Sequence, residues 1–261
     1  MKNFVSKIVP DFIIIRLRRI LKKRKFKNKI SHMSKLNQAD FINGLREVGI
    51  KAGDTVFVHC SLSNLGFVKN GPLDIINAMK KVITHNGNII IPSFSISQSM
   101  EETLKSKKYT FDVLKTHAST GSLPNLFLKI KGVKRSVHPT HSVAVWGKDS
   151  SFLVDKHYKA ETNFGNNTPF EKFLNINGKI LGLGVNYAPI TFYHTYEDLN
   201  LDKFPKVYLD KKIPALMIDE NKNSFKSKFF CHDKKYAKNR IEKDHSIQNY
   251  FQKVFEESIS K

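Results

Sequence analysis

The sequence contains little cysteine and no long apolar run. Only Cys60 and Cys231 occur among 261 residues, too few to form the disulfide framework of a small secreted domain. The longest apolar run near the amino terminus is residues 12–15, far short of the roughly 20 residues that a membrane-spanning helix needs. Internal repeats of roughly 20 to 50 residues are absent. We therefore expect a globular protein of the reducing cytoplasm, neither exported nor inserted in a membrane.

Acidic residues are also scarce, since 23 Asp and Glu stand against 44 Lys and Arg and the formal net charge is +21. Residues 1–36 hold twelve of the basic residues and a single acid, Asp11. Apolar residues at helical spacing between Pro10 and Arg24 predict a basic amphipathic helix. Such a tail can lie peripherally on an anionic membrane surface, and a solvated, partly disordered arm is the alternative. Nucleic-acid binding is disfavoured, because no recognition motif accompanies the charge.

A folded domain is predicted over residues 37–261, after the tail of residues 1–36. Asn37 is a predicted N-cap for a helix whose inner face carries Phe41, Leu45 and Val48, with Gly49 at its end.

A strand, helix and strand follow. Residues 55–60 are rich in β-branched and aromatic residues, as strands are. A helix begins at Pro72, has apolar residues at helical spacing and is predicted to end by Gly87, before the apolar strand at residues 88–92. Such a unit is typical of a parallel sheet covered by helices.

The second half of the chain alternates less regularly. Its predicted elements are strands at 142–146 and 179–185, short helices at 150–156 and 169–174, a β-hairpin over 208–218 and 224–231, and a helix at 233–258. The predicted fold class is α/β, with a mostly parallel central sheet flanked by helices and an antiparallel addition.

The first of three polar groups runs from His59 to Gly66, directly after the first strand. The end of a strand in an α/β fold is where backbone donors receive an anionic or extended cofactor. A tight turn with a hydrogen-bonded histidine is the alternative.

The second polar group runs from Arg135 to Ser142 and contains His138 and His141. Pro139 disfavours helix at His138, so the pair lacks the helical spacing and the glutamate of a zinc protease. Arg135 supplies a fixed charge that suits a phosphate or carboxylate, or pairs with a structural acid.

The third polar group spans residues 191–198. If these residues form a helix, His194 and Glu197 are three apart on one face, and the carboxylate orients the imidazole. This arrangement fits a general base and its partner, with a surface ion pair as the alternative.

The order and spacing of these groups resemble the aminoglycoside N3-acetyltransferase family over about residues 37–255. The matching motifs are residues 53–56, 59–63, Gly66, 87–94, Gly121, 135–142, 166–169, 181–185 and 191–197. Cys60 stands where that family commonly has serine.

The resemblance implies a fold distinct from the GNAT acetyltransferases, and transfer of an acetyl group from acetyl-CoA to an amine on a sugar without a metal. It implies that His194 is the base and Glu197 its partner. It further implies that Ser61, Leu62 and Ser63 hold the cofactor, and that four residues line the acceptor side or support the base: Arg135, His138, His141 and Ser142.

The acceptor is the open question. Aminoglycosides are polycations, whose approach a net charge of +21 opposes. We therefore expect a nucleotide-linked or lipid-linked amino sugar of a surface glycan, with an aminoglycoside antibiotic and resistance as the alternative. More distant alternatives are a metal hydrolase using His138, His141 and His194, and a non-catalytic binder of membrane or nucleic acid.

Overall fold

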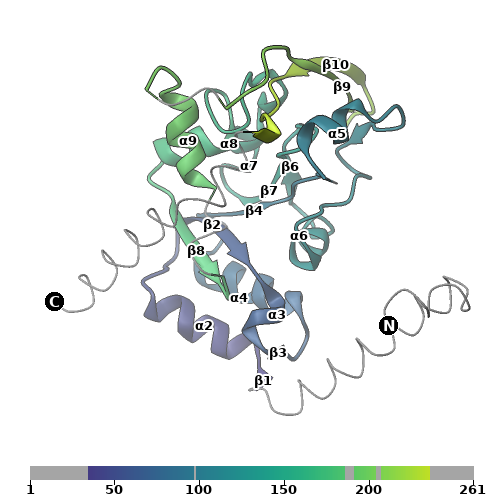
Figure 1. Cartoon of the computed structure of the whole chain (residues 1–261). Coiled ribbons are helices and arrows are strands. Elements are labelled where there is room, and N and C mark those ends of the chain that lie inside the picture. The colour runs from purple at the N-terminus through teal and green to yellow at the C-terminus, as the bar shows by residue number, and fades with distance from the viewer. Residues whose placement is uncertain (1–34, 97, 186–190, 204–206, 236–261) are drawn as a thin grey trace, which may run out of the picture.

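The computed structural model describes residues 35–96, 98–185, 191–203 and 207–235 (Figure 1). The predicted helix at 10–24, and all but the first residues of the one predicted at 233–258, lie outside these ranges. No helix among the described residues is long and apolar enough to cross a membrane. The elements are β1 (Lys35–Leu36), α2 (Gln38–Glu47), β2 (Thr55–Cys60), α3 (Leu62–Leu65), β3 (Phe67–Val68), α4 (Pro72–Ile83), β4 (Asn88–Pro92), α5 (Met100–Lys105), β5 (Phe111–Asp112), α6 (Ser122–Phe127), β6 (Lys134–Arg135), β7 (Val143–Gly147), α7 (Ser150–Val154), a 3-10 turn (His157–Lys159), α8 (Pro169–Asn175), β8 (Lys179–Leu183), α9 (Phe192–Leu199), β9 (Ile213–Ile218) and β10 (Ser224–Phe229).

The central sheet has five strands in the order β6-β7-β4-β2-β8. β2 pairs in parallel with both β4 and β8, which confirms the predicted strand-helix-strand unit. β7 pairs antiparallel with both β4 and β6. Four strands therefore share one direction and β7 opposes them.

Helices cover both faces of this sheet, and alternate side chains of its strands serve two separate cores. Val56, Val58 and Ile91 point to the face covered by α2, α4 and α6. Phe57 and Ile90 point to the opposite face, where they meet α7, α8 and α9. The architecture is a three-layer α/β/α arrangement (Figure 1).

The first predicted helix forms with the predicted cap. Asn37 accepts from the Ala39 backbone N–H, and Asp40 accepts from the Asn37 N–H, both at 2.8 Å. Phe41 and Leu45 are buried, but the prediction for Val48 is wrong, because 64% of that residue is exposed. α2 ends at Glu47, so Val48 is its C-cap and leaves the inner face.

Gly87 does not end α4, which stops at Ile83. Gly87 instead lets two segments of the chain approach closely, because a Cβ at this residue would lie 2.2 Å from the Asp54 carbonyl oxygen. That contact lets the Asn88 N–H donate to the same Asp54 oxygen at 2.9 Å and starts β4 beside β2.

The predicted hairpin forms a second sheet. β9 and β10 pair antiparallel over six residues each, and β5 joins β9 in parallel. This sheet has its own core around Phe111, Met217 and Phe229, with α5 packed on it.

Candidate active site

All three polar groups lie at one end of the strands of the central sheet. The parallel strands β2, β4 and β8 end at Cys60, Pro92 and Leu183. β7 runs in the opposite direction and starts at this end of the sheet, where Val143 pairs with Pro92. Ligands of open α/β sheets bind beyond the carboxyl ends of the strands. The three groups therefore border the part of the fold that most often holds a ligand.

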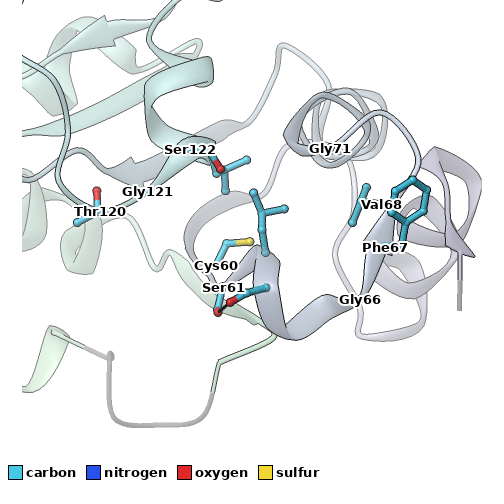
Figure 2. A pocket seen from close by; sticks show the side chains of 12 residues that line it. Cys60, Ser61, Gly66, Phe67, Val68, Gly71, Thr120, Gly121 and Ser122 are labelled. Atoms are coloured by element: carbon cyan, nitrogen blue, oxygen red, sulfur yellow. Dashed lines mark hydrogen bonds between the residues drawn. The ribbon is translucent and has the colours of Figure 1, made fainter. Parts of the chain in front are cut away.

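The loop after β2 forms a wall of a cavity of about 600 Å³, here called the outer cavity. Ser61, Leu62 and Ser63, which the sequence assigned to the cofactor, all line it. Figure 2 shows Cys60 and Ser61 between the Thr120–Ser122 segment and the Phe67–Val68 strand. Ser61 to Asn64 were predicted as a turn, and three of these residues form the start of α3.

The end of β8 holds this loop in place. The Ser61 N–H donates to the Leu183 carbonyl at 2.9 Å, and the Asn64 side chain donates to the Gly184 carbonyl at 3.0 Å. Gly184 has φ +63°, and a Cβ there would lie 2.8 Å from the Ser61 carbonyl oxygen. A larger residue would therefore displace the loop that lines the outer cavity.

A second cavity of about 260 Å³, here called the inner cavity, adjoins the first. The two share Cys60, Thr120 and Leu123. Its other walls are mostly apolar and reach Thr191, which directly precedes α9. A ligand in the outer cavity can therefore extend through the inner one toward α9.

Two residues that line the inner cavity each carry a buried polar atom without a partner. Among the described residues, neither His59 Nε2 nor Thr191 Oγ1 has a hydrogen-bond partner. The sequence analysis allowed a hydrogen-bonded histidine at this position, and His59 Nε2 lacks that bond. Both atoms have almost no solvent-accessible surface, so these two residues line the inner cavity through their other atoms.

Cys60 lines both cavities but is not disposed to be a nucleophile. Burial raises the pKa of its thiol to about 12. The thiolate is the reactive form, so at neutral pH Cys60 presents an uncharged thiol to the ligand.

α9 brings His194 and Glu197 together as the spacing predicts. His194 Nδ1 and Glu197 Oε2 are 2.8 Å apart. Their side chains are 18% and 16% exposed, which leaves both within reach of a ligand. The His194 ring stacks on Phe164, with ring centroids 5.3 Å apart, and His232 lies at 5.8 Å. The His194 ring is thus contacted by Glu197, Phe164 and His232.

Sequence reasoning missed the residues that anchor α9. The Tyr208 hydroxyl donates to the Asp198 carboxylate, with its oxygen 2.6 and 2.7 Å from the two carboxylate oxygens. The same carboxylate accepts from the Phe164 N–H at 2.9 Å, and burial raises its pKa. Asp198 therefore ties the helix to the segment carrying Phe164. No sequence signal marks this contact, which joins residues ten and 34 apart.

His138 is fully buried and faces the protein interior. Its Nδ1 accepts from the backbone N–H groups of Thr140 and His141, at 3.3 and 2.9 Å. Its ring stacks on His157 at 4.4 Å. Burial, with a smaller contribution from His157, holds the pKa of His138 well below its usual value. His138 therefore shapes the turn before β7 as a neutral ring.

His141 is also buried, but it lies nearer to α9. Its Nδ1 is 2.9 Å from Thr140 Oγ1, and its ring contacts Phe94 and Phe164 at 4.9 and 5.0 Å. Phe164 stacks on His194 from the other direction. His141 is thereby placed to support the His194 ring through Phe164.

Arg135 binds protein groups, not a ligand. It is 5% exposed, donates to the carbonyls of Ser93 and Thr116, and bonds Ser95 Oγ and Ser142 Oγ at 3.0 Å. The Ser142 hydroxyl donates in turn to the Ser93 carbonyl at 2.7 Å. Of the two roles left open for Arg135 and Ser142, the geometry favours support.

Among the described residues, no group of three His, Cys, Asp or Glu side chains is arranged to hold a metal ion. His138 Nδ1 accepts two backbone N–H groups and is therefore not available as a metal ligand.

A family model described as aminoglycoside 3-N-acetyltransferase matches residues 57–257. The SPbeta prophage-derived aminoglycoside N(3')-acetyltransferase-like protein YokD of Bacillus subtilis is 30% identical over 170 residues, covering 59% of this chain and 61% of that protein. Aminoglycoside N(3)-acetyltransferase VII of Streptomyces paromomycinus is 26% identical over 188 residues, covering 67% and 65%. The matched regions thus span just under two thirds of these relatives.

The fold recurs in solved structures. AAC-IIIb in binary complex with CoASH superposes with a TM-score of 0.67 at 20% identity, covering 87% of this chain and 85% of that one. At this identity the likeness concerns the fold, a mixed α/β architecture that is not that of the GNAT enzymes.

Proposed function

Since the chain belongs to the aminoglycoside 3-N-acetyltransferase family, we propose that it is an acyltransferase that moves an acetyl group from acetyl-CoA to an amine of an amino sugar. The observation that carries the proposal is a pair of adjoining cavities. The outer cavity shares wall residues with the inner one, and the inner one reaches Thr191, from which α9 delivers His194 within one turn.

Acetyl-CoA fits these cavities by shape and by chemistry. The outer cavity offers hydroxyl groups at Ser61 and Ser63, and the narrower, mostly apolar inner cavity suits the acetyl end. AAC-IIIb, which shares the fold, is known in a complex with CoASH. The assignment of Ser61, Leu62 and Ser63 to the donor rests on their place in the outer cavity.

His194 acts as the general base. An amino sugar reaches neutral solution as an ammonium, which must lose a proton before its nitrogen attacks the thioester carbonyl. Glu197 faces Nδ1 at 2.8 Å, so Nε2 is the nitrogen that accepts this proton. The Glu197 carboxylate then stabilises the imidazolium that forms. The amine lone pair forms the amide bond while the carbon–sulfur bond breaks, and the second proton that the nitrogen loses goes to the leaving sulfur, so that CoA departs as the thiol.

The preferred acceptor is an amino sugar joined to a nucleotide or to a membrane lipid, as in the building of a surface glycan. Both carry phosphate, which a protein of net charge +21 attracts. The names of the relatives point instead to aminoglycosides. An antibiotic acceptor requires local acidic groups, and of the two acids nearest His194 in α9, Asp198 is engaged by Tyr208. This engagement favours the anionic acceptor.

The basic segment of residues 1–36 has a role under the lipid-linked form of this proposal. It would hold the enzyme at an anionic cytoplasmic membrane surface, with each basic residue adding about 1 kcal/mol. Co-sedimentation with phosphatidylglycerol vesicles, comparing the full chain with one that starts at Lys35, tests this. Equal sedimentation of both would remove the tail from the account.

The test of function is thiol release from acetyl-CoA. Kanamycin-type aminoglycosides, nucleotide-linked amino sugars and lipid-linked amino sugars are assayed in parallel, with His194→Ala as the control. Release with the sugar nucleotides alone supports the anionic acceptor. Release with the antibiotics alone makes the chain a resistance enzyme, and no release with any amine, together with no binding of CoA, contradicts the proposal as a whole.

A further inference from the structure

A third cavity adjoins the outer cavity at the end away from the inner one. It is an open groove of about 990 Å³, here called the lysine groove, and Phe67 lines both it and the outer cavity. The outer and inner cavities instead share Cys60, Thr120 and Leu123. Figure 2 shows Cys60 between Thr120 and Phe67. The three cavities therefore follow one another in the order inner cavity, outer cavity, lysine groove.

The lysine groove takes its name from Lys35, Lys69 and Lys81, which line it together with one acid, Asp74. None of the described residues that line the outer cavity is charged. The salt bridges between described residues use none of the three lysines. Asp74 is 3% exposed, and its carboxylate accepts from the backbone N–H and the side-chain amide of Asn70 at 2.9 and 3.0 Å. The groove therefore offers an excess of positive charge beside an uncharged cavity.

The backbone places two of the lysines on one side of a small sheet. β1 and β3 pair in parallel, with Lys35 directly beside Phe67. The Lys69 N–H donates to the carbonyl of the last β1 residue at 2.9 Å, which continues this pairing by one residue. Because side chains alternate along a strand, Phe67 and Lys69 point to the same side, and Lys35 points there as the partner of Phe67. Lys81 joins them from α4, seven residues after Asp74 and therefore on the same helix face.

We infer that the lysine groove binds the 3′-phospho-ADP end of CoA, with its lysines on the phosphate groups. The inference rests on the proposed function and deepens it. CoA carries its thioester at one end of a long chain, and a pyrophosphate and a 3′-phosphate at the other. With the acetyl group in the inner cavity, the uncharged outer cavity receives the pantetheine arm, and the phosphates reach the neighbouring groove. Lysine binds phosphate as a point charge, so three lysines suit this end of the molecule.

The same groove does not suit the phosphates of a nucleotide-linked acceptor. The acceptor amine must reach His194, and the inner cavity extends to Thr191, directly before α9. The lysine groove lies at the opposite end of the series of cavities. Donor and acceptor therefore bind from opposite ends, and the groove lysines govern the affinity for the donor.

The test compares the dissociation constants of CoA, 3′-dephospho-CoA and pantetheine, measured on the full chain by titration calorimetry. These ligands share the pantetheine arm and carry successively fewer phosphates. Lys69→Met and Lys81→Met each remove one charge from an exposed residue of the groove. Lys148→Met is the matched control, because it makes the same change at an exposed lysine that lines none of the three cavities.

We expect wild-type protein to bind CoA most tightly and pantetheine most weakly. Lys69→Met and Lys81→Met should each weaken CoA binding by about 3- to 10-fold and leave pantetheine binding and the melting temperature unchanged. A lysine that contacts the pyrophosphate weakens the binding of 3′-dephospho-CoA as well, whereas one that contacts the 3′-phosphate does not. Lys148→Met should match wild type with all three ligands, and added salt should weaken CoA binding more than pantetheine binding.

Wild-type protein that bound CoA no more tightly than pantetheine would overturn the inference, whatever the variants did. Equal weakening of CoA and pantetheine binding in the two groove variants, or no weakening of CoA binding in either, would overturn it too. Failure of wild-type protein to bind CoA at all would contradict the proposed function itself.

Discussion

Two pairs of side chains near the same end of the sheet strands each contain a histidine but have opposite surroundings. His194 faces a carboxylate at 2.8 Å and keeps 18% of its side chain exposed. His138 faces a second imidazole, that of His157, at 4.4 Å and is fully buried. The first pair places a negative charge beside the imidazole, whereas in the second pair burial lowers the pKa of both rings. The residue type is therefore no guide to the role, and the neighbour and the access to solvent decide it.

The largest loss of activity is expected at the partly exposed pair of His194 and Glu197. His194→Ala removes the base from a site whose other walls remain, so acetyl transfer should fall by about 10²- to 10⁴-fold. CoA affinity and melting temperature should stay near the wild-type values. Steady-state thiol release and calorimetric titration of CoA measure these quantities, and undiminished turnover would remove His194 from the mechanism.

The buried histidines should instead make the fold sensitive to acid. The pKa values of His138, His141 and His157 are all lowered by burial, so the unfolded chain binds protons that the folded one refuses. Stability is then fully present above pH 6.5 and is lost as the pH falls below it. From pH 7.5 to 5.5 each histidine that stays neutral contributes a loss of about 1.4 kcal/mol, or about 4 kcal/mol for the three.

Urea unfolding at the two pH values measures this difference. A free energy of unfolding that did not change between them would show that these rings accept protons in the folded state.

A smaller loss of stability is expected at Arg135. Arg135→Met would leave the carbonyls of Ser93 and Thr116 without their donor, which costs about 3 kcal/mol in total. The neighbouring Lys134→Met is the matched control, since Lys134 is exposed and should change stability by less than about 0.5 kcal/mol. Chemical denaturation compares the two. Unaltered stability in Arg135→Met combined with lost CoA binding would return Arg135 to a ligand-binding role.

The smallest effect is expected to be the loss of catalytic rate on substitution of Glu197. Glu197→Gln keeps an oxygen for His194 Nδ1 but removes the negative charge that stabilises the imidazolium. We expect kcat to fall by about 10- to 100-fold with KM for acetyl-CoA unchanged. Glu220→Gln, on the exposed β9–β10 turn, is the control. A loss as large as that of His194→Ala would mean that Glu197 does more than orient and stabilise the ring.

Local patterns along the sequence predicted the parts of the molecule that are locally determined. The β2-α4-β4 unit follows from periodicity and from Pro72. The contact between His194 and Glu197 follows from their i, i+3 spacing within one helix. The reversed direction of β7 was not predicted, because an apolar run does not encode the direction in which a strand enters a sheet.

Contacts between distant segments were not predicted either. The bond from Tyr208 to Asp198 and the inner-cavity wall from Cys60 to Thr191 depend on how separate elements pack. His59 belongs to this class too, since its place in the wall of the inner cavity becomes visible only once that cavity is formed. The resemblance to the acetyltransferase family marked the segment containing His59 but assigned that residue no role.

The most direct test of the central contrast is one paired experiment, with His194→Gln and His138→Gln measured for both kcat and free energy of unfolding. The account predicts that His194→Gln loses at least about 100-fold in kcat and keeps its stability. It predicts that His138→Gln loses about 1–3 kcal/mol of stability and keeps the kcat of its folded fraction. Equal losses in both quantities for both variants, or the reverse assignment, would contradict it.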